Sequence, residues 1–483
     1  MTDYGITAYG AYVPRLRLER ASIAAAHKWM APSLRGLGKG ERAFCSWDED
    51  AITMAVEAAR DALGDKSREG IDALTLASTT LPYADLQNSV IAIGALALGG
   101  GVSGTDIAGS QRAGLSGLAR ALDAAGADQL FLTSDRLRAK PASTLEMAYG
   151  AGAAAFRLGS EKVIARKLGG ATVAAQFIDH FRSANHAHDY FWEERWVRDE
   201  GYAKIVPEAA KAALAKAGIS AADLSVMIMA SPLKGSAEMI ARKIGFGGRI
   251  ADSLNDQVGY AGTAHPLLML AGELEQAKAG DRILVLAFGQ GAEALVLEVT
   301  DAIDDFRPRR GLSGAIADKV STSDYLRMLS FYDELDAEWG MRSEKSGKAA
   351  LTTLYREADQ LSAFVAGKCR TCETVQFPQL AYCVNPECKA PASQFAPEPL
   401  SDQPASVLTF TGDWLSYYPA PPLYVGFVQF DIGARLLMEI VDVGSEGLEV
   451  GTPLRMAYRI KEPDKVRGFN RYFWKATPLA TGA

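Results

Sequence analysis

The chain repeats one series of sequence segments in two halves about 150 residues apart, and this duplication most constrains how it can fold. Four segments of the first half have counterparts in the second half, in the same order. The pairs are EAARDAL (57–63) with EAAKAAL (208–214), LTLAS (74–78) with MIMAS (227–231), GLARALDAAGADQLFL (117–132) with MLAGELEQAKAGDRILVL (269–286), and GAGA (150–153) with GQGA (289–292). This order predicts two copies of one alternating strand–helix unit, covering about residues 1–160 and 161–310.

Duplicated α/β halves normally pack around shared central helices. Here these would be the helix after Ser110 and the helix after His265, so both helix starts are expected to face one site between the halves. Segment 162–202 lies between the copies, has no clear period and is expected to wall the pocket. Its histidines are expected to be packed or solvated, with metal ligation as the alternative; they are His180, His186 and His188.

The stretch TDIAGSQRAGLSGLARAL (105–122) reads as a short strand, a tight turn of small residues and an apolar helix. Such a turn points its first side chains into a cavity and aims backbone N–H groups and the positive helix end at the same place. That geometry suits a nucleophile or a developing oxyanion. The alternative is an ordinary tight strand-to-helix turn.

The composition narrows the class of protein. The 483 residues are 48% hydrophobic and carry a formal net charge of −7, which favours neither nucleic acid nor an anionic membrane as the main partner. The first residues, MTDYGITAYG, lack the pattern of a signal peptide, and no uncharged apolar run is long enough to span a bilayer. Four of the five cysteines are clustered, which indicates a metal site in a reducing compartment. The chain is expected to be cytoplasmic.

The pattern changes after residue 299. Residues 311–365 are predicted to be a helical linker, and residues 366–392 contain two cysteine pairs at the spacing of a zinc ribbon. The four expected ligands of one structural zinc ion are Cys369, Cys372, Cys383 and Cys388. Residues 393–483 alternate β-rich runs with turns and predict a barrel of roughly five strands. Its basic, aromatic end (455–475) leaves nucleic-acid binding as a minor alternative.

Residues 1 to about 300 resemble the thiolase superfamily, closest to hydroxymethylglutaryl-CoA synthase and ketoacyl synthase III. Residues 350–483 resemble the zinc-ribbon plus OB-fold partners of thiolase-like enzymes that act on acyl-CoA. The segments that carry the resemblance are GITAYGAYVPRLRL, DEDAITMAVEAARDAL, the turn at 110–114, ASPLK, GYAGTAHPLLMLAGELEQAKAGDRILVLAFGQGA and LYREADQLSAFVAGKCRTC. The implied fold is a duplicated thiolase-like α/β domain followed by a zinc ribbon and a small OB-type barrel.

The chain departs from the family at its chemical positions. The resemblance places the acylated cysteine at Gln111, the histidine at Ala230, the asparagine at Val258 and the general-base glutamate at Thr79. An acyl-cysteine mechanism at this turn is therefore not expected. Glutamine is not a nucleophile, but its NH2 group can hold a thioester carbonyl or an enolate oxygen. Ketosynthase-like domains with glutamine at this position resemble decarboxylases, which stabilise a carbanion without becoming acylated.

Other side chains are candidates for the remaining roles. His265 is the expected acid or base, Ser110 a nucleophile if a base lies beside it, and Arg112 a partner for carboxylate or phosphate. Core packing is the alternative for His265, and a solvated charge for Arg112. Cys45 is more readily a buried apolar residue than a nucleophile. Further hydrogen-bond donors are Tyr83 and Tyr260.

These features predict an enzyme that makes or breaks a carbon–carbon bond next to the carbonyl of a CoA thioester. CoA-dependent cleavage (retro-Claisen or retro-aldol) or acyl transfer on a β-keto or β-hydroxy acyl substrate is favoured. The alternatives are a synthase-like acyltransferase using Ser110 or Cys45 and a non-catalytic acyl-CoA-binding subunit of a thiolase complex. The CoA phosphates are expected near Lys234 or the basic end of the barrel. A homodimer through the thiolase-like half is also expected.

Overall fold

The computed structural model describes residues 4–344, 349–444 and 447–479, which divide into two compact units. The first unit contains the residues up to 46, 50–90 and 99–334. The second contains residues 47–49, 91–98 and 335–483. Each unit is described by itself.

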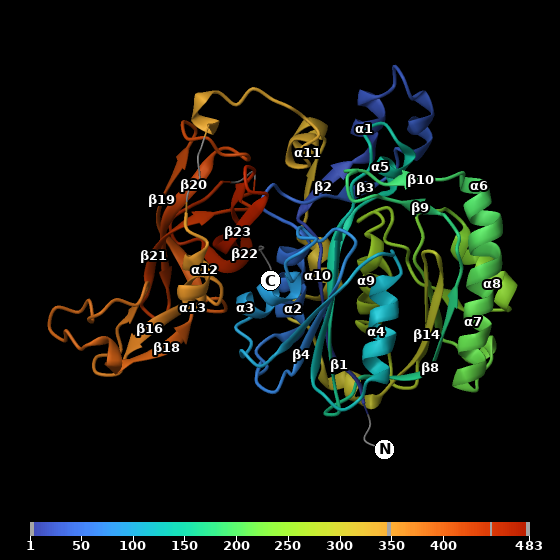
Figure 1. Ribbon diagram of the computed structural model, residues 1–483, viewed down its shortest axis with the longest axis horizontal. Helices are drawn as coiled ribbons and strands as arrows, with labels where there is room; N and C mark the ends of the chain where they lie inside the picture. Colours follow the sequence, from blue (N-terminus) through green and yellow to red (C-terminus); the bar gives the residue numbers. More distant parts are fainter. Residues whose placement is uncertain (1–3, 345–348, 445–446, 480–483) are drawn as a thin grey trace. The chain divides into compact units, whose positions relative to one another are not determined.

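The first unit is built around a ten-stranded mixed sheet (Figure 1). Its two halves have the same internal order, and they meet where the first strand of each half pairs antiparallel with the other. The first half runs β1 (Gly5–Tyr12), β7 (Ala151–Gly159), β6 (Gln129–Arg136), β4 (Ala73–Ala77), β5 (Ser103–Ile107), and the second half runs β8 (Ala165–Ala174), β14 (Gly291–Val299), β13 (Arg282–Phe288), β11 (Val226–Met229), β12 (Arg249–Ile250). This symmetry agrees with the predicted duplication of one strand–helix unit.

The helices of the first unit follow the same duplication. α2 (Ala51–Leu63) packs on strands of the first half, and α7 (Ala203–Ala217) packs on strands of the second. α4 (Ala113–Asp123) and α9 (His265–Leu274) each contact strands of both halves and each other, so they are the central helices (Figure 1). The remaining helices of the first unit are α1 (Arg20–Ala26), α5 (Thr144–Ala148), α6 (Glu194–Trp196), α8 (Ser236–Ile244), α10 (Gly311–Ala317) and α11 (Tyr325–Phe331). Most of α3 (Asn88–Ala95) belongs to the second unit.

Local chemistry sets where these elements begin. The side chain of Asp50 accepts hydrogen bonds from the backbone N–H groups of Ile52 and Thr53, and Thr53 Oγ1 accepts from the Asp50 N–H. This capping box starts α2 at Ala51, three residues later than the acidic stretch from Asp48 suggests. Segment 162–202 also differs from expectation, because Ala165–Ala174 is regular strand β8 rather than irregular wall.

The first unit continues beyond the expected boundary at residue 310. β15 (Val320–Thr322) pairs in parallel with β2 (Leu16–Glu19), which in turn pairs with β3 (Glu41–Ala43). Strand pairing of this kind fixes residues 311–334 to the first unit, so the predicted linker does not begin at 311. The sequence pattern did not predict β15, which falls in the segment expected to be a helical linker.

Two β structures make up most of the second unit. β16 (Val365–Cys369) pairs with β17 (Val375–Gln376) and with β18 (Phe395–Pro399), so β18 belongs with the cysteine segment. A closed five-stranded barrel follows, which confirms the expected number of strands. Its order is β19 (Ala405–Asp413), β20 (Leu423–Phe430), β21 (Arg435–Ile440), β23 (Phe469–Pro478), β22 (Pro453–Asp464). The short helices of this unit are α12 (Thr352–Arg356) and α13 (Ala358–Leu361).

Candidate functional site

The turn before α4 is built by close backbone approaches. A Cβ atom at Gly114 would lie 2.3 Å from the Thr263 carbonyl oxygen, just before α9. A Cβ atom at Gly289 would lie 3.3 Å from the Gln111 nitrogen and 2.7 Å from Ser110 Oγ. Glycine is needed at both positions because any side chain would push these segments apart. The starts of the two central helices therefore meet, as the duplication predicted.

Gln111 is buried at this helix start and lines a small cavity together with Tyr149, Asp179 and His180. Its side chain hydrogen-bonds Tyr149, whose hydroxyl lies 2.9 Å from Asp189 Oδ2. Arg182 Nη1 donates to the other Asp189 oxygen over 3.2 Å. Burial holds the pKa of Tyr149 well above its ordinary value, so the phenol stays protonated and donates to the carboxylate.

The excursion, residues 175–202 between β8 and α7, supplies one wall of this cavity. Asp179, His180, Phe191 and Val197 all line it, as expected for this segment. The excursion contains the hairpin of β9 (His180–Phe181) and β10 (Tyr190–Phe191). It therefore brings an acid–base pair and an aromatic side chain to the start of α4.

Asp179 and His180 form a close ion pair inside the cavity wall. His180 Nδ1 lies 2.7 Å from Asp179 Oδ2, and Asp179 is 5% exposed. The other expected wall histidines behave differently: His188 Nε2 lies 2.8 Å from Glu334, and His186 is exposed. The sequence analysis did not single out Tyr149, Asp179 or Asp189. The adjacent Asp179-His180 pair was a local signal for Asp179.

His265 begins α9 as predicted, but its ring does not face the cavity. Its Nδ1 accepts from the Ala261 N–H over 3.2 Å, and its Nε2 lies 2.8 Å from the Ser253 carbonyl oxygen, to which it donates. The residue is fully buried, and burial lowers the pKa of His265 to about 4. Both ring nitrogens are used by the backbone, so the geometry favours the packing alternative over the expected acid–base role.

Ser110 and Arg112 are engaged with the second half of the chain. Ser110 Oγ donates to the Gly289 carbonyl oxygen over 2.9 Å, and Arg112 Nε donates to the same oxygen over 3.0 Å. Arg112 Nη1 also donates to Ser116 over 2.8 Å and lies 3.5 Å from Glu293. These contacts hold the helix start in place. Among the residues that the structure describes, no base lies within hydrogen-bond distance of Ser110, and Arg112 is paired internally rather than left in solvent.

The remaining candidates are spread over the first unit. Cys45 is fully buried, with its thiol 3.7 Å from Met54 Sδ. Tyr260 is buried beside Tyr149, with ring centroids 6.4 Å apart, while Tyr83 is partly buried. Lys234 is exposed and follows Pro232 and Leu233, which line the cavity. Of these residues, only Lys234 combines solvent access with a place beside the cavity lining.

Thr79, at the position implied for the family glutamate, belongs to a hydrogen-bond network around the Asp135 carboxylate. Thr79 donates its backbone N–H to Asp135 Oδ1 over 2.8 Å, and Ser78 and Thr80 donate their hydroxyls to the same oxygen. Asp135 Oδ2 accepts from both the N–H and the hydroxyl of Thr263. Asp135 is fully buried and joins β6 to the turn before α9. Because both of its oxygens accept several hydrogen bonds from protein groups, Asp135 is suited to hold these segments together rather than to act as a base.

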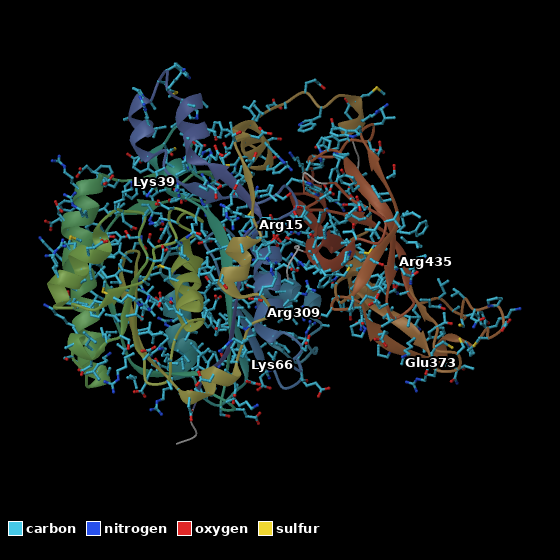
Figure 2. All side chains as sticks on the ribbon, turned by 180° about the vertical axis from the view of Figure 1, so that it is seen from behind. Arg15, Lys39, Lys66, Arg309, Glu373 and Arg435 are labelled. Carbon is cyan, nitrogen blue, oxygen red and sulfur yellow. The ribbon has the colours of Figure 1, made fainter. Side chains whose placement is uncertain are left out.

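The four predicted metal ligands converge in the second unit. Their sulfur atoms lie within 4.8 Å of one another, with 3.8 Å between Cys369 and Cys388 and 3.6 Å between Cys372 and Cys383. Four thiolates about 2.3 Å from a tetrahedral zinc ion would be separated by about 3.8 Å. The cluster therefore fits one zinc ion. Glu373, labelled in Figure 2, follows Cys372 in the turn that presents the first pair.

The basic end of the barrel is neutralised within the second unit. Lys475 is 1% exposed and lies 3.0 Å from both Asp48 and Glu439. Arg459, also 1% exposed, lies 2.5 Å from Glu49 and 2.6 Å from Asp442. Two of the basic residues expected to meet phosphate are thus buried in ion pairs. Among the described residues, no helix has the length and apolar character to cross a membrane.

No protein-family model matches the chain. Among solved structures, it is similar to an HMG-CoA synthase complexed with CoA (TM-score 0.57, 17% identity, 72% of this chain and 95% of that one). It is also similar to 3-oxoacyl-(acyl carrier protein) synthase III of Pseudomonas aeruginosa (TM-score 0.54, 20% identity, 62% and 98%). These likenesses show the thiolase-like α/β fold.

Sequence comparison identifies relatives more similar to this chain than these solved structures are. The chain is 32% identical over 324 residues to the hydroxymethylglutaryl-CoA synthase of Aeropyrum pernix, which covers 63% of this chain and 87% of that protein. Because most of the relative's length is matched, the similarity is not confined to one motif. The chain belongs to the hydroxymethylglutaryl-CoA synthase family.

Proposed function

We propose that the protein acts on CoA thioesters and makes or breaks a carbon–carbon bond next to a carbonyl group, without an acyl-cysteine. The observation that carries this proposal is the place of Gln111. It is buried, lines the cavity at the start of α4, and stands where the family resemblance implies the acylated cysteine. The family relationship supports the substrate class, and Gln111 supports the change of mechanism.

Gln111 is suited to hold a developing negative charge. Its carboxamide has two N–H groups, and the start of an 11-residue helix adds the positive end of a dipole. A positioned donor of this kind contributes about 10²–10³-fold to a reaction that passes through an oxyanion. A thioester enolate is such an oxyanion, and it forms when a bond at the α-carbon breaks or is made.

Cleavage of a β-keto or β-hydroxy acyl thioester is the favoured direction. Condensation in the acyl-cysteine manner needs a nucleophile that first carries the acyl group. The residues that line the cavity include neither cysteine nor serine. Cleavage needs only a stabilised enolate and a proton donor, with water or the CoA thiol as the acceptor of the released acyl group.

The acyltransferase alternative has less support. Ser110 donates its hydroxyl hydrogen to the Gly289 carbonyl oxygen, and Cys45 is fully buried beside Met54. Neither side chain lines the cavity. The exposed ammonium of Lys234 remains the proposed contact for a CoA phosphate, because it lies next to the cavity lining on the chain.

The second unit is proposed to be a zinc ribbon joined to an OB-type barrel. The sulfur separations support one tetrahedral structural zinc ion. The barrel has the five strands typical of an OB-fold, with consecutive antiparallel pairs and a parallel pairing of β21 with β23. A homodimer through the first unit is also proposed.

One experiment separates these possibilities. The purified full-length protein is incubated with a panel of acyl-CoA and β-keto acyl-CoA thioesters, and products, free CoA thiol and intact protein mass are measured. We expect cleavage products with no added mass on the wild-type protein. Gln111→Cys should gain an acyl mass from a reactive thioester, whereas Gln276→Cys, at an exposed position, should not.

Two outcomes would overturn the proposal. A stable acyl adduct on the wild-type protein that Cys45→Ala or Ser110→Ala abolishes would establish the acyltransferase alternative. No turnover of any thioester, together with tight binding of acyl-CoA, would favour a non-catalytic subunit.

A further inference from the structure

The cavity beside Gln111 contains an acid–base pair to which nothing above gives a role. His180 and Asp179 both line it. His180 Nδ1 lies 2.7 Å from Asp179 Oδ2, while its Nε2 forms no hydrogen bond with any residue that the structure describes. The second Asp179 oxygen, Oδ1, is buried and equally has no hydrogen-bond partner in the described ranges.

An unpartnered carboxylate oxygen is costly in a buried wall unless a ligand satisfies it, whereas His180 Nε2 keeps access to solvent. Asp179 is 5% exposed, and the His180 side chain is 15% exposed. Structural histidines such as His265 have both nitrogens bonded. The geometry at His180 is instead that of a base oriented by a carboxylate, with one nitrogen left for a reacting group.

The charges around the pair make the His180 imidazole a stronger base. Burial of His180 opposes its positive charge, but the hydrogen bond and negative charge of Asp179 outweigh this, so the pKa of His180 is raised. Asp189 acts in the same direction and Arg182 against it. From the other elements, the cavity is lined by Gln111 and by the neutral phenols of Tyr149 and Tyr202.

We infer that His180, oriented by Asp179, is the general acid–base group of the reaction at Gln111. This rests on the proposed function. In cleavage by CoA, His180 Nε2 takes the proton of the CoA thiol. The thiolate sulfur bonds to the β-carbonyl carbon, the bond between the α- and β-carbons breaks, and its electron pair forms the thioester enolate. His180 then returns the proton to the α-carbon. The products are a new CoA thioester of the released acyl group and the shortened thioester, so the step balances.

Neither residue is one that the resemblance implies for the family, and both come from the excursion. Segment 162–202 lies between the duplicated copies, and its histidines were expected to be packed or solvated. The chain therefore combines glutamine at the position implied for the cysteine with an acid–base pair that the excursion supplies.

The test uses the full-length protein and a matched pair of variants. His180→Gln should lower kcat by about 10²–10⁴-fold, the range for loss of a general acid–base group. His186→Gln, an exposed histidine of the same excursion, should leave kcat unchanged. Asp179→Asn should move the acidic limb of the pH–rate profile to lower pH, because it removes the charge that raises the pKa of His180.

A second readout does not depend on turnover. The chain has five histidines, so their imidazole signals can be assigned by NMR with single variants. The His180 signal should titrate above the ordinary value near 6.5 and shift downward in Asp179→Asn. Full activity of His180→Gln in a protein whose Gln111→Ala variant is inactive would overturn this inference alone. Absence of thioester turnover in the wild-type protein would overturn the proposed function instead.

Discussion

The Tyr149 hydroxyl lies 2.9 Å from Asp189 Oδ2, and this bond ties the residue that follows α5 to the excursion that walls the cavity. Asp189 is held from its other side by Arg182. Burial raises the pKa of Asp189, while Arg182 and His180 act against that change. The contact also places the phenol oxygen where it meets the side chain of Gln111.

Tyr149→Phe should therefore weaken both the wall and the site. Removing a buried hydrogen bond to a charged group costs about 1–3 kcal/mol of unfolding free energy. We expect a lower thermal midpoint and a fall in kcat, because Gln111 loses its partner. Tyr190→Phe, on an exposed ring of the same excursion, is the control. Equal effects of the two variants would show that the Tyr149–Asp189 bond does not organise the cavity.

His265→Ala should destabilise the protein without a specific loss of catalysis. The ring is fully buried, and its removal leaves a cavity and two unpaired backbone groups, at a cost of about 2–5 kcal/mol. Folded variant protein should keep a kcat within a few-fold of the wild type. A drop of two orders of magnitude in kcat, with unchanged stability, would restore the acid–base role predicted from the sequence.

The same residue gives a pH dependence with a defined sign. The folded-state pKa of His265 is about 4, below the unfolded value near 6.5. Between these values the unfolded state binds the additional proton. Burial of neutral His265 therefore contributes fully to the unfolding free energy above about pH 6.5. This contribution is lost as the pH falls toward 4, by up to about 3 kcal/mol. The measurement is the wild-type unfolding free energy minus that of His265→Ala, followed from pH 7 to 4; a flat difference would contradict it.

Purified protein should contain about one zinc ion per chain, held by the four clustered cysteines. Cys372→Ser should lose the metal and destabilise the second unit, since a structural zinc contributes directly to folding. Cys45→Ser changes the one cysteine outside the cluster and should keep the metal. Elemental analysis of both variants decides the matter. Retention of zinc by Cys372→Ser would contradict the assignment of the ligands.

Lys475→Ala should destabilise the second unit while CoA binding is kept. Its ammonium lies between Asp48 and Glu439, and removing one partner of a buried ion pair costs about 3–5 kcal/mol. Arg435→Ala, on an exposed residue of the same barrel labelled in Figure 2, should have little effect. Thermal unfolding and CoA titration measure the two properties. A stable Lys475→Ala protein that no longer binds CoA would show that the lysine meets phosphate after all.

The first unit should associate into a dimer along its β5 edge. β5 ends one side of the ten-stranded sheet, so its backbone groups that face away from β4 have no neighbouring strand in the part of the chain that the structure describes. Light scattering at micromolar concentration should give twice the mass of one chain. Hydrogen exchange should show protected amides in Ser103–Ile107. A monomer with rapid exchange there would contradict the dimer.

The sequence by itself determined the features that repeat or depend on local chemistry. The matched segments predicted a duplicated α/β fold, and the central helices that follow Ser110 and begin at His265 are where the repeat places them. The spacing of the cysteines predicted their cluster, because two short turns bring each pair together without help from distant residues. Such signals are periodic or short-range, so one sequence is enough to show them.

The tertiary structure decided which side chains meet. His265 opens the expected helix, but packing turns its ring toward Ser253 and away from the cavity. Asp179 and Tyr149 are distant in sequence and reach one cavity only because the excursion folds over the start of α4. The direction of a side chain and the partner of a buried charge depend on the packing of remote segments. The spacing of residues along the chain therefore predicts neither the direction of a side chain nor the partner of a buried charge.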